Sequence, residues 1–276
     1  MALSRRYAFP LAAQLAMPPR LDDPGFLTLL DTLERLGFCG IELNIVDFDS
    51  LPPEAYLDPL AKRHLRLLMI ATGACAKKKN LSLSSPDQLV REQTLREMEK
   101  CLALASRLEA GAICGFIKGM AGQDRGQALK NFRESLARLD SIVRRFQTPI
   151  LIEATNHYEA TLANTLAETA KILDGFDNPH FHILPDTYHM NIEEASPLAA
   201  LVAQEGRYVS IHVSDNNRRF PGFGALDFRT ALAILEKLRF PGFMAIEGRA
   251  GQDILEDLAI SAKHLEEASR PLLFED

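Results

Sequence analysis

Short apolar runs alternate with longer amphipathic segments along the chain. The runs are rich in Ile, Val, Leu and Phe, and residues of these types favour buried β-strands. In the segments between them, apolar residues recur every three or four positions, which is the period of a helix with one buried face. The predicted strands cover residues 7–9, 39–43, 67–71, 112–116, 150–153, 181–184, 209–213 and 244–247.

Residues that start and stop helices flank several of the amphipathic segments. Over residues 25–36, Phe26, Leu30 and Leu33 share one face, and Gly37 is a typical helix terminator. Pro86 follows two serines and suits the first turn of a helix over residues 86–108. Further helices are predicted over residues 53–64, 124–146, 161–173, 192–204, 227–238 and 253–268.

Eight strands that alternate with helices predict a (β/α)8 TIM barrel, whose usual length of about 250 residues suits this chain. The alternative is a doubly wound open sheet. No G-x-G-x-x-G motif follows the first predicted strand, which removes the usual reason to prefer that fold. No low-complexity linker divides the chain, so we predict a single barrel domain over residues 1–276.

The composition is that of a globular protein, with 47% hydrophobic and 25% charged residues. Acidic residues number 37 and basic residues 31, which gives a formal net charge of −6. This balance disfavours a nucleic-acid partner, because such a protein needs a basic face. No apolar run approaches the roughly 20 residues that span a bilayer, so no membrane partner is expected.

The cysteine pattern and the start of the chain predict a cytoplasmic protein. No C-x-x-C pair occurs, and a chain of this length has no need of disulfide bonds. Ser4-Arg5-Arg6 resembles the start of a twin-arginine export signal, but the segment after it is short and contains Pro10 and Gln14. Cleavage after Met17 would also remove the first predicted strand. The four cysteines, which we expect to be reduced, are Cys39, Cys75, Cys101 and Cys114.

Four side chains that can bind a metal recur where the last four predicted strands end. They are 33, 26 and 35 residues apart, about one βα unit each, so neighbouring strands would carry them to the same rim of the barrel. Three carboxylates and one imidazole suit Mn²⁺, with Co²⁺ and Mg²⁺ as alternatives. The competing interpretation is that each acid caps a helix or forms an ion pair. The four residues are Glu153, Asp186, His212 and Glu247.

Polar residues in the loops beyond these strands are candidates to hold a substrate. Glu159 follows the fifth strand, His189 follows the sixth, and Arg218 follows the seventh, just before a glycine-rich turn. Lysines at positions 77–79 and Lys118 follow the third and fourth strands. We interpret the lysine run as a solvated loop, and contact with an anionic or phosphorylated substrate is the alternative for all four lysines.

These motifs resemble those of the ketose 3-epimerases, such as the D-tagatose and D-psicose 3-epimerases, within the xylose-isomerase-like TIM-barrel superfamily. The resemblance rests on E-A-T-N-H-Y-E, D-T-Y-H-M-N-I-E-E, H-V-S-D-N-N-R-x-x-P-G-x-G and the late I-E, and is strongest over residues 150–250. It implies that Glu153, Asp186, His212 and Glu247 bind the metal and that Glu153 and Glu247 are the acid/base pair. It also implies that Glu159, His189 and Arg218 hold the O1–O3 end of a small-molecule sugar.

The activity implied is epimerisation at C3 of a ketose through an enediolate. The alternatives are an aldose–ketose isomerase of the hydroxypyruvate isomerase kind, a keto-sugar lyase, and a sugar-binding protein without activity. A DNA repair endonuclease of the same superfamily is disfavoured by the net charge and by the single-ion ligand set. The chain lacks tryptophan, which the family often places near the end of the fourth strand, so the sugar is left open. Barrels of this family often associate, so a homo-oligomer is an alternative to a monomer.

Overall fold

The computed structural model describes residues 6–273, with side chains described to residue 270, and confirms the (β/α)8 barrel. The parallel strands follow the order β6-β5-β4-β3-β2-β1-β8-β7. The barrel closes between β6 and β7, where the main-chain N–H of Ile183 donates to Arg207 O and that of His212 donates to Pro185 O. The strands are β1 (Leu11–Ala16), β2 (Gly40–Asn44), β3 (Arg66–Ala71), β4 (Gly111–Cys114), β5 (Ile150–Glu153), β6 (Phe181–Leu184), β7 (Ser210–Val213) and β8 (Phe243–Ile246).

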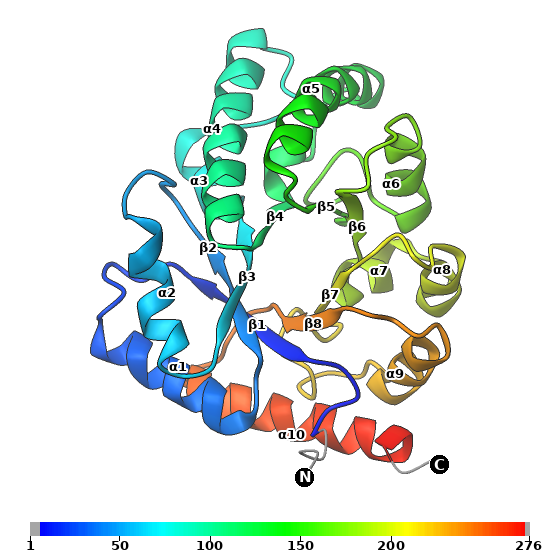
Figure 1. The fold of residues 1–276 in the computed structure, drawn as a ribbon. Coiled ribbons are helices and arrows are strands. Elements are labelled where there is room, and N and C mark those ends of the chain that lie inside the picture. Colours follow the sequence, from blue (N-terminus) through cyan, green and yellow to red (C-terminus); the bar gives the residue numbers. More distant parts are fainter. Residues whose placement is uncertain (1–5, 274–276) are drawn as a thin grey trace.

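The helices form a ring outside the strands, and the long α10 runs beside α1 (Figure 1). A short 3₁₀ turn, η1 (Phe116–Lys118), follows β4. None of the helices within residues 6–273 is long and apolar enough to cross a membrane. The helices are α1 (Pro24–Leu36), α2 (Pro53–Ala61), α3 (Gly73–Lys79), α4 (Gln88–Arg107), α5 (Arg125–Phe146), α6 (Leu166–Leu173), α7 (Thr187–Glu193), α8 (Pro197–Ala203), α9 (Phe228–Lys237) and α10 (Ile254–Leu273).

The apolar residues separate into two layers because side chains alternate across a strand. One small cluster, which comprises Met69, Ala71, Ile113, Leu151 and Leu184, lies on one face of strands β3 to β6. A much larger cluster joins the other face of the strands to the helices. The four cysteines are free, and three of them are fully buried.

The first predicted strand, residues 7–9, is wrong, because β1 begins at Leu11. Pro10 has no N–H to donate, but its carbonyl accepts from the main-chain N–H of Met244 and so leads into the sheet. Tyr7 and Phe9 are buried for another reason. The Tyr7 hydroxyl donates to Leu36 O, and the ring of Phe9 packs edge-on against Phe240.

The bounds of several predicted helices differ from the structure, and the helix α3 was not predicted. The helix predicted over residues 161–173 begins at Leu166, because Thr165 caps it with its hydroxyl. The helix predicted over residues 192–204 is replaced by α7 and α8, which are separated where Ser196 caps a new N-terminus. Residues 77–79 lie in α3 instead of a loop.

Candidate metal centre and active site

The four predicted metal ligands meet at the carboxyl ends of the strands. Glu153 is the last residue of β5, His212 lies within β7, and Glu247 directly follows β8. Asp186 follows β6 and caps the N-terminus of α7. One ligand atom from each of the four residues lies within 4.8 Å of the others, so the spacing read from the sequence corresponds to one point in space.

Several atoms at this point are buried without a hydrogen-bond partner among the described residues. They include His212 Nδ1, Glu153 Oε1 and Glu247 Oε2. His212 Nδ1 lies 2.8 Å from Glu247 Oε2 and 3.6 Å from Glu153 Oε1, yet neither contact has hydrogen-bond geometry. Buried polar atoms without partners are costly. A divalent cation between these atoms would satisfy all three, so the residues present fit a metal ion.

Glu42, in the middle of β2, orients the imidazole from behind. Its Oε2 accepts from His212 Nε2 at 2.8 Å and from Gln14 Nε2 at 3.1 Å. A carboxylate on the far nitrogen of a histidine fixes its tautomer and leaves the near nitrogen free to bind metal. Sequence reasoning missed Glu42, although a glutamate inside the apolar run G-I-E-L-N was a usable signal.

The electrostatics of the site also favour a cation. Four carboxylates meet in this group, and one partly buried guanidinium, that of Arg218, pairs with two of them. With the imidazole neutral, as a metal ligand must be, the negative charges outnumber the positive one, and a divalent ion would reduce this excess. The carboxylates are those of Glu42, Glu153, Asp186 and Glu247.

The pKa shifts follow this charge distribution. Burial alone would raise the pKa of Glu247, but the charges of Arg218 and His212 hold it well below its usual range. Burial alone would lower the pKa of His212, yet Glu42 and Glu247 raise it well above its usual value. Both shifts arise from the opposite charges that this cluster brings together.

Asp186 both caps a helix and forms an ion pair, as the competing interpretation of the acids expects. Its Oδ1 caps α7 by accepting from the N–H groups of Tyr188 and His189. Its Oδ2 lies 2.6 Å from Arg218 Nη1, and Arg218 Nη2 lies 3.0 Å from Glu247 Oε2. Arg218 therefore lies partly buried against the proposed ligands instead of extending into solvent.

A single carboxylate organises the loop that carries Arg218. Asp215, which is buried, accepts main-chain N–H groups from Gly222, Gly224 and Leu226 at 2.8–3.0 Å. Its own carbonyl accepts from the N–H of Arg218. The glycine-rich turn noted in the sequence thus folds back onto Asp215. A side chain at position 224 would collide with this carboxylate, since a Cβ there would lie 2.3 Å from Asp215 Oδ1.

His189 is held with one nitrogen toward the proposed ligands. Its Nδ1 accepts from the main-chain N–H of Asn156, and the Asn156 side-chain amide lies 2.7 Å away. The ring proton therefore sits on Nε2, which lies 3.7 Å from Glu153 Oε1. Glu159 reaches this network through Asn156, whose amide donates to Glu159 Oε1 at 3.4 Å. His189 thus presents a hydrogen-bond donor to the site.

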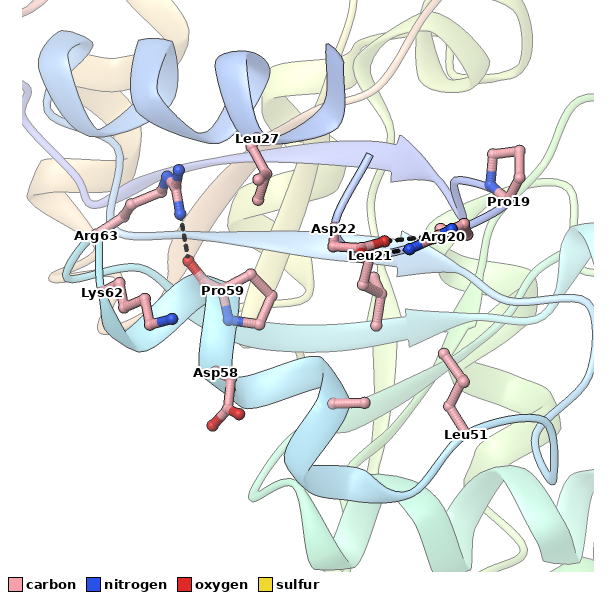
Figure 2. Close-up of a pocket in the computed structure, with 11 residues that line it drawn as sticks. Pro19, Arg20, Leu21, Asp22, Leu27, Leu51, Asp58, Pro59, Lys62 and Arg63 are labelled. Carbon is pink, nitrogen blue, oxygen red and sulfur yellow. Dashed lines mark hydrogen bonds and ion pairs between the residues drawn. The ribbon is translucent and has the colours of Figure 1, made fainter. Parts of the chain in front are cut away.

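A cavity of about 290 Å³ opens beside the cluster, on the side of strands β1 to β4. Glu153 and Glu247 form part of its lining, together with Gln14, Asn44, Thr72 and Phe116. A larger cavity of about 600 Å³ lies between α1 and α2, where Arg20 pairs with Asp22 (Figure 2). That second cavity contains none of the cluster residues, so the smaller cavity is the candidate substrate site.

The structure separates the lysines that the sequence grouped together. Lys77 lines the candidate substrate cavity, whereas Lys79 pairs with Glu97 at 2.8 Å. Lys118 is fully buried and donates to the main-chain carbonyl of Glu153 at 2.8 Å. The alternative of a phosphate contact is therefore wrong for Lys118. Burial lowers its pKa to about 8.

Gly115, directly after β4, makes room for the Glu153 carboxylate. A Cβ at position 115 would lie 2.2 Å from Glu153 Oε2, and the φ of −93° brings no left-handed strain. We expect Gly115→Ala to displace the carboxylate and to lower kcat about 100-fold, because a shift of about 1 Å at a reacting group has that effect. The melting temperature should change little, since a flexible carboxylate can move.

Steady-state kinetics and thermal unfolding check this prediction. Gly175→Ala is the matched control, because a Cβ at position 175 meets nothing within 4 Å. Equal activity in the two alanine variants would show that Glu153 does not need the space above Gly115.

Comparisons with known proteins agree with this geometry. The family model described as xylose isomerase-like TIM barrel matches residues 30–268. A 3-dehydro-D-guloside 4-epimerase of Escherichia coli (strain K12) is 36% identical over 109 residues, 40% of each chain. An L-ribulose 3-epimerase of Methylomonas sp. (strain DH-1) is 26% identical over 208 residues, 74% of this chain and 71% of the relative.

Solved structures show the same fold. The apo form of a 3-keto-D-glucoside 4-epimerase from E. coli superposes with a TM-score of 0.80 at 20% identity, over 94% of this chain and 98% of that chain. A D-allulose 3-epimerase from Methylomonas sp. in complex with D-allulose gives 0.76 at 19% identity, over 97% and 96%. The prediction of an isomerase-class enzyme is confirmed by the sequence relatives, which are epimerases. The chain therefore belongs to the xylose isomerase-like TIM barrel family, with ketose 3-epimerases among its relatives.

Proposed function

We propose that this enzyme inverts C3 of a ketose by removing and returning a proton, with Glu153 and Glu247 as the two acid/base residues and a divalent metal, Mn²⁺ first, as cofactor. The observation that carries the proposal is the pair of glutamates at the ends of β5 and β8, each with a buried carboxylate oxygen that has no hydrogen-bond partner among the described residues. The ketose 3-epimerases among the sequence relatives support it.

The metal ion would be held by Glu153, Asp186, His212 and Glu247. When bound, it supplies Lewis-acid polarisation of the ketone, which makes the neighbouring carbon acidic enough to lose its proton. The proton leaves C3 to one glutamate, the electron pair moves into the enediolate of the sugar, and the other glutamate, protonated, returns a proton from the opposite face. The roles swap with the direction of the reaction.

The remaining polar residues would hold the sugar. His189 presents Nε2–H near Glu153, and Arg218 pairs with Asp186 and Glu247, which supports both as donors to sugar oxygens at the O1–O3 end. Glu159, which is linked to His189 through Asn156, would accept from a hydroxyl. The rest of the sugar would extend along the cavity toward Asn44 and Lys77.

A second candidate reaction is epimerisation at C4 of a 3-ketoglycoside. The relative at 36% identity is a 3-dehydro-D-guloside 4-epimerase, and the structure with a TM-score of 0.80 is a 3-keto-D-glucoside 4-epimerase. A ketone at C3 acidifies the proton on C4 just as a ketone at C2 acidifies the proton on C3. The same pair of glutamates therefore suits both substrates.

Incubation of ketoses and 3-ketoglycosides in D₂O with Mn²⁺ tests the proposal and separates the candidates. We expect deuterium at C3 of a ketose, together with its epimer. Deuterium at C4 of a 3-ketoglycoside would establish the second candidate instead. Deuterium only at C1 of a ketose, or only at C3 of hydroxypyruvate, would show an aldose–ketose isomerase. Because Lys77 lines the cavity, the panel includes sugar acids and sugar phosphates.

A further inference from the structure

Lys118 is a buried cation without a part in the proposed reaction. It lies in the η1 turn after β4, its side chain is fully buried, and it follows the core residue Ile117. Its ammonium donates to Glu153 O at 2.8 Å and to the hydroxyl of Thr155. Removing an ammonium group from water is costly, and an apolar residue would fill the same space at lower cost. The charge therefore needs a reason other than packing.

Both acceptors of Lys118 belong to the short segment that begins with a proposed metal ligand. Glu153 ends β5, and its main-chain carbonyl accepts from the Lys118 ammonium. Thr155 lies two residues further, directly before Asn156, which contacts His189 and Glu159. The Lys118 ammonium thus binds the chain at two points, at Glu153, which is a proposed acid/base residue, and at Thr155, next to the loop that carries Glu159.

The same turn contacts Glu153 on a second side. The Glu153 carboxylate occupies the space where Gly115 lacks a Cβ. Lys118, three residues later, holds the main-chain carbonyl of the same glutamate. The backbone of Glu153 is therefore fixed by a hydrogen bond to a charged donor, a strong type of bond, while the carboxylate is confined by the shape of the turn.

We propose that Lys118 is a positioning residue, which fixes the end of β5 so that the Glu153 carboxylate points at the metal cluster. This inference rests on the proposed function in one respect, namely that Glu153 binds the metal and moves a proton. Lys118 itself touches neither the sugar nor the metal.

The test compares Lys118→Met with Ile117→Ala in the full chain. Methionine keeps the length of the side chain but has no donor, and Ile117 is a buried core residue of the same turn. We expect Lys118→Met to weaken Mn²⁺ binding about 10–100-fold, the usual effect of losing an outer partner of a metal ligand. Its kcat should fall by a similar factor with KM nearly unchanged, and its crystal structure should show the Glu153 carboxylate displaced from Gly115. Ile117→Ala should lower thermal stability and leave Mn²⁺ affinity as it is.

Each outcome decides the matter. Unchanged Mn²⁺ affinity with Glu153 in place, or equal losses in the two variants, would reduce Lys118 to a structural role. If Lys118→Met does not fold, Thr155→Val removes one acceptor and should still weaken Mn²⁺ binding several-fold, and no change there would overturn the proposal. Wild-type protein that binds Mn²⁺ without proton exchange on any sugar would contradict the proposed function but not the positioning by Lys118. If wild-type protein binds no Mn²⁺, the crystal structure of Lys118→Met still tests the proposal. A displaced Glu153 carboxylate would support positioning by Lys118, and an unmoved one would contradict it.

Discussion

Replacing either Glu153 or Glu247 by Gln is expected to lower kcat by about 10²–10⁴-fold, the usual contribution of a general acid or base. Glutamine keeps the size and one oxygen of the side chain but accepts no proton at neutral pH. Because the two carboxylates would serve opposite faces of the sugar, neither can replace the other. Each variant should therefore lose epimerisation.

Solvent exchange distinguishes the two glutamates. Any exchange with D₂O that remains should occur with one epimer as substrate in Glu153→Gln and with the other epimer in Glu247→Gln. NMR at the exchanging carbon measures it. Manganese content is measured alongside, since both residues are proposed ligands. Glu134→Gln is the control, because that glutamate is exposed and pairs with Arg91 on α4. Near-normal epimerisation by either site variant would contradict the two-base scheme.

Removal of the metal is expected to abolish turnover and to lower the free energy of unfolding. Without a cation, the carboxylates of the cluster repel one another and several buried atoms lack partners. Restoring Mn²⁺ at 100 times its Kd should return about 2.7 kcal/mol of stability together with activity. Thermal unfolding and rate measurements after chelation and back-titration check this. Asp186→Asn should keep the α7 cap, because asparagine also caps helices, but should lose most of the Mn²⁺-dependent stabilisation. A chelated protein that is fully active would contradict metal dependence.

The clustering of the four proposed ligands was predictable because its signal lies in the repeat of the fold. Strand ends recur once per βα unit and the barrel brings those ends together, so spacing alone predicted that Glu153, Asp186, His212 and Glu247 meet. The first strand was misplaced because Tyr7 and Phe9 are aromatic and buried, whereas β1 is rich in small residues that give a weaker strand signal.

The supporting residues depend on contacts between distant segments, which spacing does not reveal. Glu42 is 170 residues from the histidine that it orients. The need for glycine at position 115 is seen only when the Glu153 carboxylate is known to lie where a Cβ would be. Lys118 was grouped with the loop lysines because sequence does not show which way a side chain turns. The 3₁₀ turn directs it inward, under the end of β5.

The central claim is that one divalent ion binds between side chains from the last four strands. Anomalous diffraction at the manganese edge, from crystals grown with Mn²⁺, tests it most directly. The account predicts one peak per chain, in contact with a carboxylate oxygen of Glu153, Asp186 and Glu247 and with Nδ1 of His212. Absence of that peak, with Glu153 and Glu247 turned apart into solvent, would contradict it.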